Sequence, residues 1–291
     1  MAEIRFKSPL KIFLVRNISF FILFFAICAS PMRGVFQNNI YAEELDNVKI
    51  SDLYSQAKDL FRQANSRSVT TSEAMSLYKK SAMRYERLIK EGGIENGMIY
   101  YNLGNIYFRM NDIGRAILNY RRAEQYIPDD TNLKQNLKYA REKRIDKIDE
   151  KQETKVLKTL FFWHYDLSIK TRIMLFTIFF AIVWISAGFR IFFKKPSLFW
   201  CITVSALISL LLSGSLIAEE FILKKTRPGV IISSETTARK GNSETYEPSF
   251  KEPLHAGTEF VLIEDRGEWL QIELSDSRTC WVPSDDVELV R

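Results

Sequence analysis

The chain has 291 residues, of which 46% are hydrophobic and 26% are charged, and its formal net charge is +6. This length exceeds one ordinary domain and suits two small domains with additional segments. The two histidines and three cysteines are too few and too scattered for a Cys/His metal cluster or a disulfide framework.

The positive charge is unevenly distributed along the chain. Residues 1–42 carry 5 Lys and Arg against 1 acid, residues 43–160 carry 22 against 18, and residues 161–232 carry 8 against 3. Residues 233–291 are acidic, with 6 Lys and Arg against 13 Asp and Glu. Since the basic residues flank apolar segments or are dispersed in a weakly basic middle, the net charge does not indicate nucleic-acid binding.

Residues 1–42 have the pattern of an export signal. Basic residues precede an apolar run over 18–29, which is short of the ~20 residues that a spanning helix needs. The pattern predicts a signal peptide that is cleaved after Ala29 or Ala42. Because Ile27 or Ile40 would occupy a position where a small residue is preferred, an uncleaved N-terminal anchor is the alternative.

Residues 43–158 are predicted to form a helical domain. Within it, residues 98–128 place apolar and small side chains at helical spacing on two consecutive segments. The spacing breaks at Asn111-Asp112, and Pro128 ends the second segment. These features predict a helical hairpin, with small residues where the two helices approach closely.

The hairpin resembles the tetratricopeptide repeat. The resemblance rests on the signature positions of that repeat, with tyrosine in place of the usual tryptophan at the first: Tyr100, Leu103, Gly104, Tyr107, Ala116, Tyr120, Ala123 and Pro128. A single repeat cannot bury its own face, so an upstream unit and a downstream solvated capping helix are expected. The charged run over 134–158 is interpreted as an exposed helix face rather than a binding patch.

The resemblance implies that the first helix of each repeat lines a concave groove that binds a peptide or a partner helix. The candidate contacts in this chain are Tyr101, Asn105, Phe108 and Arg109. Asn105 stands at a place that holds a carboxylate in some repeats of the family. The alternative interpretation is that these polar residues are merely solvated.

Residues 159–171 are predicted to connect the helical domain to membrane segments along the bilayer surface. The aromatic stretch over 161–165 is typical of a membrane-interface belt. A lone histidine in such a belt, His164, is expected to be a bystander rather than a ligand.

Two apolar runs, over 172–193 and 197–218, are long enough to span a membrane. The joint Lys194-Lys195-Pro196 is so short that it predicts a hairpin with both outer ends on one side of the bilayer. Since the basic flank of residues 1–42 stays in the cytoplasm, the hairpin tip is expected to return there. Both soluble domains are then expected on the extracytoplasmic side of a bacterial cytoplasmic membrane.

Residues 230–291 change to the period of two that indicates β-strands. An apolar strand over 259–263, a turn over 265–267 and an alternating segment over 269–274 predict a small all-β barrel. The order of landmarks, including Trp269-Leu270 and Trp281-Val282, resembles a bacterial SH3-like domain, although Cys280 stands where that family usually has glycine. The resemblance implies a domain that binds peptides or cell-wall material, or that braces a neighbour.

Trp269 and Trp281 are candidate binding residues on an aromatic surface, the alternative being barrel core for at least one of them. Cys280 is expected to be a packed small residue, and a redox-sensor role for its thiol is a separate hypothesis. The chain contains no nucleophile elbow, phosphate loop or paired-carboxylate motif. The sequence therefore predicts a protein that is not an enzyme, with no catalytic residue, no cofactor and no metal.

The complete order of segments resembles the BatE-type proteins of the bacterial aerotolerance (Bat) group. The resemblance implies an envelope complex with membrane proteins that carry von Willebrand factor A domains, linked to a MoxR-type ATPase, and a role in oxidative-stress tolerance. Two functions are predicted: a membrane-anchored scaffold that binds protein partners through the groove and the barrel, or a membrane-anchored module that binds peptidoglycan.

Overall fold

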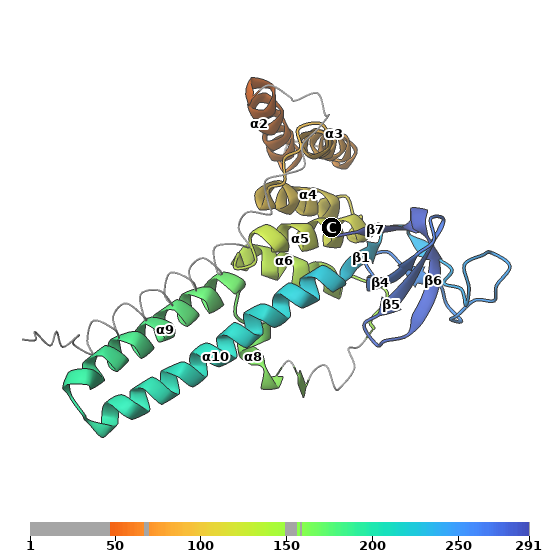
Figure 1. The fold of residues 1–291 in the computed structure, drawn as a ribbon. Coiled ribbons are helices and arrows are strands. Elements are labelled where there is room, and N and C mark those ends of the chain that lie inside the picture. The colour runs from red at the N-terminus through yellow and green to blue at the C-terminus, as the bar shows by residue number, and fades with distance from the viewer. Residues whose placement is uncertain (1–46, 67–69, 149–155, 158, 291) are drawn as a thin grey trace, which may run out of the picture. The chain divides into compact units, whose positions relative to one another are not determined.

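The computed structural model describes residues 47–66, 70–148, 156–157 and 159–290. In this part of the chain the protein is mostly helical, with a small antiparallel sheet and two long apolar helices (Figure 1). These features confirm the coarse fold class that the sequence predicts. The predicted signal peptide or anchor at 1–42 lies outside the described residues.

The helical domain consists of α2 (Asn47–Ala64), α3 (Thr71–Lys90), α4 (Gly97–Arg109), α5 (Ile113–Tyr126) and α6 (Thr131–Glu142). Four of these helices begin at a polar side chain that accepts a hydrogen bond from a backbone N–H of the first turn. The capping residues of α3, α4, α5 and α6 are Thr70, Asn96, Asp112 and Asp130. Local sequence therefore determines where each of these helices starts.

The contact between α4 and α5 depends on a small residue in each helix. A Cβ atom added at Gly104 would lie 2.4 Å from the ring of Tyr120, so only glycine allows the two helices to come this close. Ala116 on α5 is fully buried. Between the helices, Asn111 has a φ of 61°, a left-handed conformation that asparagine tolerates better than most residues.

The two apolar helices, α9 (Ile169–Phe192) and α10 (Pro196–Lys225), are long and apolar enough to cross a membrane and pack against each other as a hairpin. The short helix α8 (Phe162–Tyr165) precedes them. Both apolar helices are longer than the predicted segments. Helix α9 begins three residues earlier than residue 172, because the Ser168 hydroxyl caps its first turn, and α10 continues beyond residue 218.

The β domain begins at Arg227, directly after α10, rather than at residue 230. Its strands are β1 (Arg227–Ile231), β2 (Glu235–Thr236), β3 (Leu254–His255), β4 (Glu259–Asp265), β5 (Trp269–Leu274), β6 (Thr279–Pro283) and β7 (Val287–Leu289). Five of them form an antiparallel sheet in the order β6-β5-β4-β1-β7, and β2 pairs with β3. A turn of 3-10 helix over Ser284–Asp286 leads into β7.

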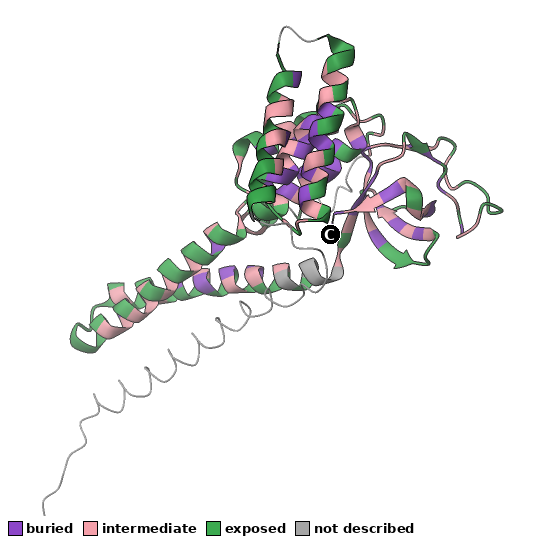
Figure 2. Ribbon diagram, turned by 90° about the horizontal axis from the view of Figure 1, so that it is seen from above, coloured by how far each residue is buried: buried purple, intermediate pink, exposed green. Residues whose placement is uncertain are grey.

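Buried hydrophobic residues form two clusters, one in the helical domain and one in the β domain. Figure 2 colours the buried residues of both domains purple. Two residues of the β domain, Val230 and Val290, belong to the cluster of the helical domain. Ile231, which lies next to Val230 in β1, belongs to the cluster of the β domain. Strand β1 therefore alternates between the two cores and joins the domains.

Candidate functional site

Three of the four predicted groove residues contact other helices of the domain. The side-chain oxygen of Asn105 accepts hydrogen bonds from the Tyr120 hydroxyl at 2.8 Å and from the Asn136 amide at 2.9 Å. The same Asn136 amide donates to the Tyr101 hydroxyl at 3.0 Å. The ring of Phe108 lies 5.5 Å from the ring of Tyr139, which is also on α6.

These contacts show that α6 is more than a solvated cap. Leu133, Leu137 and Ala140 on α6 are almost completely buried, and its Asn136 links two residues of the predicted groove. Arg109 remains exposed at the end of α4. The binding role of Tyr101, Asn105, Phe108 and Arg109 stays a prediction, in which Arg109 is the residue most open to a partner.

The two candidate tryptophans of the β domain lie in different environments. Trp281 is 7% exposed, and the guanidinium of Arg266 lies 5.0 Å from its ring centroid. Trp269 is half-buried and lines a cavity of about 480 Å³ together with Phe250 and Pro253. The cavity therefore includes one of the two tryptophans, while Trp281 is buried without belonging to either core cluster. The binding role of both residues stays a prediction.

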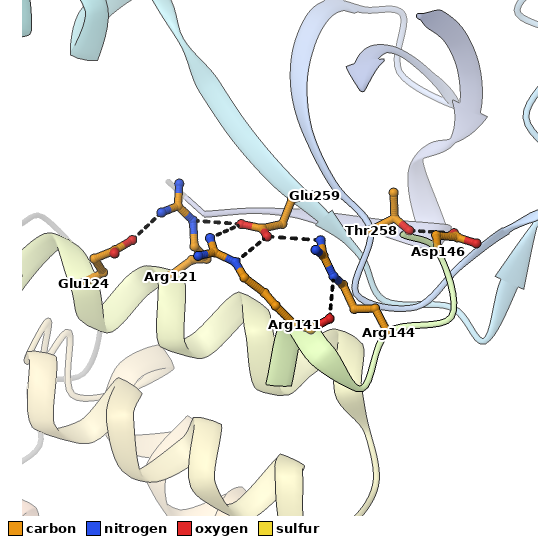
Figure 3. Close-up of polar contacts among 7 residues, drawn as sticks. All are labelled: Arg121, Glu124, Arg141, Arg144, Asp146, Thr258 and Glu259. Atoms are coloured by element: carbon orange, nitrogen blue, oxygen red, sulfur yellow. Dashed lines mark hydrogen bonds and ion pairs between the residues drawn. The ribbon is translucent and has the colours of Figure 1, made fainter. Parts of the chain in front are cut away.

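The contact between the helical and β domains centres on one carboxylate. Glu259 of β4 receives two hydrogen bonds of 2.8 Å from Arg141, and its oxygens lie 3.3 Å from Arg144 and 3.3 Å from Arg121 (Figure 3). The three arginines come from α5, from α6 and from the turn after α6. Arg121 also pairs with Glu124.

The ionised form of Glu259 is favoured in this setting. Burial by itself would raise the pKa of the carboxyl, but the hydrogen bonds from Arg141 and the charges of Arg141, Arg121 and Arg144 hold the pKa below its ordinary value. A carboxylate with one-fifth of its side chain exposed and several guanidinium partners is a strong, charge-assisted contact.

A second carboxylate reinforces the contact, and this one belongs to the helical domain while its partners belong to the β domain. Asp146, which follows α6, accepts hydrogen bonds from the backbone N–H of His255 at 2.6 Å and from the Thr258 hydroxyl at 2.7 Å. Its other oxygen lies 2.9 Å from His255 Nδ1. Burial opposes ionisation of Asp146, yet these hydrogen bonds lower its pKa below the ordinary value.

A third polar contact lies at β7. The guanidinium of Arg122 donates to the Glu288 carboxylate and to the Leu289 carbonyl oxygen, both at 2.8 Å. At another point of α5, a Cβ atom added at Gly114 would lie 2.8 Å from the Ile231 carbonyl oxygen. The absent side chain at Gly114 lets β1 approach α5 directly.

The charged run over 134–158 thus has a role that the sequence interpretation missed. Arg141, Arg144 and Asp146 lie in this run and contact the β domain, so the expectation that it is an exposed helix face was wrong for these residues. The available signal was the opposite charge balance of the two segments, 22 Lys and Arg against 18 acids in one and 6 against 13 in the other. Composition indicates such attraction without identifying the residues that pair.

A polar cluster joins the two apolar helices. Arg172 of α9 donates to Ser215 Oγ at 2.8 Å and forms an ion pair of 2.8 Å with Glu219 of α10. His164 Nδ1 lies 2.9 Å from Ser215 Oγ and 3.1 Å from a guanidinium nitrogen of Arg172. His164, expected to be a bystander in an aromatic belt, is therefore part of the contact between the helices.

Two functions considered for the sequence, metal binding and redox sensing, can be compared with the side chains that the structure describes. Among the residues that the structure describes, no group of three or more His, Cys, Asp and Glu side chains is placed to hold a metal ion. Cys280 is buried, and burial raises the pKa of its thiol to about 12. A thiol that stays protonated is a poor nucleophile, which disfavours the redox-sensor hypothesis.

No protein-family model and no curated protein matches this chain.

Proposed function

We propose that this protein is a membrane-anchored scaffold without enzymatic activity, which binds protein partners outside the cytoplasm. The observation that carries the proposal is the contact between the domains, in which three arginines of the helical domain surround Glu259 of the β domain. It joins two domains into one binding unit at the outer ends of an apolar hairpin. Tethering to a membrane raises the effective concentration of weakly binding partners.

The contact also supports the proposed arrangement at the membrane. The chain passes from the helical domain through α9 and α10 before it enters the β domain. The direct contact between Arg141 and Glu259 supports an arrangement in which the two domains lie on the same side of the bilayer. We place that side outside the cytoplasm because of the export signal expected at residues 1–42.

The family assignments belong to the same proposal. Helices α4 and α5, with Gly104 against the ring of Tyr120, support a tetratricopeptide repeat. The short antiparallel strands and the 3-10 turn before β7 support an SH3-like domain. Together with the hairpin they support a BatE-type protein, whose partners would be membrane proteins with von Willebrand factor A domains, linked to a MoxR-type ATPase in oxidative-stress tolerance.

The proposal is tested by placing a photo-crosslinking amino acid at Arg109 in the intact protein in its native membranes. Recovery of envelope proteins with von Willebrand factor A domains from this position is expected. Lys80, which is exposed on α3, is the matched control position and should recover markedly less. Equal recovery from both positions, or no protein partner from either, would count against the scaffold.

A second candidate function is peptidoglycan binding by the β domain. The cavity of about 480 Å³ beside Trp269 and Phe250 favours it, because aromatic faces in a cavity are suited to bind the apolar face of a ligand. The test is co-sedimentation of the detergent-solubilised protein with purified peptidoglycan. Trp269→Ala should lose binding, whereas Ile263→Ala, an exposed apolar control outside the cavity, should keep it. No sedimentation of the wild type would remove this candidate.

A further inference from the structure

The three arginines around Glu259 are arranged as in a carboxylate-binding site. All three belong to the helical domain, whereas the group they surround comes from the β domain, 118 residues further along the chain from Arg141. Arg141 holds both carboxylate oxygens with parallel hydrogen bonds of 2.8 Å. This two-pronged geometry is specific for planar anions such as carboxylates.

The charges of the site require an anion at the position of Glu259. Arg121 has a second carboxylate partner in Glu124, and Asp146 adds a favourable charge beside Arg144. Without Glu259, three guanidinium groups, with 29%, 36% and 20% of their side chains exposed, would face two carboxylates. Leaving a partly buried charge unbalanced is costly, so this position favours another carboxylate.

We infer that Arg121, Arg141 and Arg144 form a carboxylate-binding site of the helical domain, which Glu259 fills as an internal ligand and which an acidic segment of a protein partner can take in its place. Arg122, which holds Glu288 and the Leu289 carbonyl oxygen, supplies a neighbouring second contact for an acidic segment. The β domain then acts as an autoinhibitor of this site. The inference rests on the proposed scaffold function and specifies the chemistry of one partner.

Glu259 normally occupies the site because it belongs to the same chain as the three arginines. An attached ligand acts at an effective concentration of the order of mM, so a free acidic segment competes poorly with it. Replacing the Glu259 carboxylate by a neutral amide removes that competitor and leaves the arginines in place. The site should then become available to an external carboxylate.

The experiment measures binding of a fluorescein-labelled peptide of alternating Glu and Ser to the whole protein in detergent micelles by fluorescence anisotropy. Glu259→Gln is expected to bind this peptide at least about tenfold more tightly than the wild type, because the tethered competitor is gone. A peptide of alternating Gln and Ser should bind to neither protein. Adding Arg141→Gln and Arg144→Gln to Glu259→Gln should abolish binding of the acidic peptide.

A second readout covers the case in which Glu259→Gln does not fold. Val290 is 5% exposed and packs in the core of the helical domain. A Val290→Cys reporter is made in a protein in which Cys28 and Cys201 are replaced by Ser. Its rate of thiol labelling reports whether the β domain is docked on the helical domain. The acidic peptide in excess should accelerate labelling of this otherwise wild-type protein, and the Gln peptide should not.

Two results would overturn the inference: equal affinity of Glu259→Gln and the wild type for the acidic peptide, or equal binding of both peptides. Each of them leaves the crosslinking result at Arg109 untouched. A partner recovered there without peptide binding here would refute this site and retain the scaffold. Peptide binding at the three arginines without a partner recovered at Arg109 would refute the predicted groove and retain this site.

Discussion

Two faces of the helical domain are covered in chemically different ways. On one face, α6 covers α4 with neutral groups, in which Asn136 bonds to Asn105 and Tyr101. On the other, the β domain covers α5 and the end of α6 with ion pairs centred on Glu259. The first contact is nearly insensitive to pH and salt, whereas the second depends on carboxylates that must stay ionised. The comparison separates a permanent part of the fold from one that solution conditions can alter.

The largest expected effect is that of acid on the contact between the domains. Glu259 and Asp146 have pKa values below their ordinary values in the folded protein. Their stabilisation is therefore complete above the ordinary pKa of about 4 and is lost as pH falls through the lowered folded values. Docking should persist from neutral pH to about pH 5 and weaken progressively as pH falls below about 4.

The measurement is thiol labelling of the Val290→Cys reporter with dithiodipyridine, a reagent that reacts at acid pH. Labelling should accelerate sharply in acid, while the amide exchange of α4 and α6, corrected for its intrinsic pH dependence, changes little. Simultaneous loss of both contacts would show that the faces do not differ in the way proposed.

The substitution Glu259→Gln should have the next largest effect. It removes a carboxylate with three guanidinium partners and should weaken docking by about 2 kcal/mol, between the scale of an exposed ion pair and that of a fully buried one, because the four side chains are partly buried. The reporter at Val290 measures the change at neutral pH. Glu264→Gln, at an exposed carboxylate paired with Arg266, is the matched control and should cost less than about 1 kcal/mol.

Gly104→Ala tests the permanent part of the helical domain. The added methyl would lie 2.4 Å from the Tyr120 ring, so the free energy of unfolding should fall by about 2 kcal/mol through overpacking. Urea denaturation of the helical signal measures it. Gly214→Ala places a methyl in open space on α10 and should leave the denaturation midpoint unchanged; an equal loss in both variants would contradict the close-approach argument.

The smallest effect is expected for Asn136→Ala. This change removes the hydrogen bonds to Asn105 and Tyr101 and should lower the free energy of unfolding by about 1 kcal/mol. Because the groups are uncharged, the loss should be the same at low and high salt, whereas the effect of Glu259→Gln should shrink as salt screens the ion pairs. A salt-dependent loss of unfolding free energy for Asn136→Ala would contradict the proposed difference between the two faces.

Much of the local structure could be predicted from the residues themselves. The break between α4 and α5 lies at Asn111 and Asp112, where one residue adopts a left-handed turn and the next caps a helix. The apolar lengths predict α9 and α10, and the alternation over 269–274 predicts β5, whose side chains alternate between more and less buried positions. These features are local because period, capping and apolar length act between residues that are close in the chain.

Some helix and strand boundaries differ from the predicted ones because they depend on interactions that a hydropathy pattern does not reveal. The Ser168 cap starts α9 before the apolar run begins, and β1 starts at Arg227, where its pairing with Leu262 of β4 starts. The candidate groove residues were placed on the correct helix, yet Asn105 and Tyr101 turned out to contact α6. A helical pattern identifies a face without identifying the neighbour that covers it.

By itself, the sequence determined the helical and strand segments, the apolar hairpin and the opposite charge balance of the two soluble domains. Only the tertiary structure decided that Arg121, Arg141 and Arg144 meet at Glu259, and that His164 contacts Arg172 and Ser215. Arg141 and Glu259 are 118 residues apart, and His164 and Ser215 are 51 apart. Periodicity and turn chemistry act over a few residues, whereas ion pairs at this separation form only once the hairpin and both domains have brought their partners together.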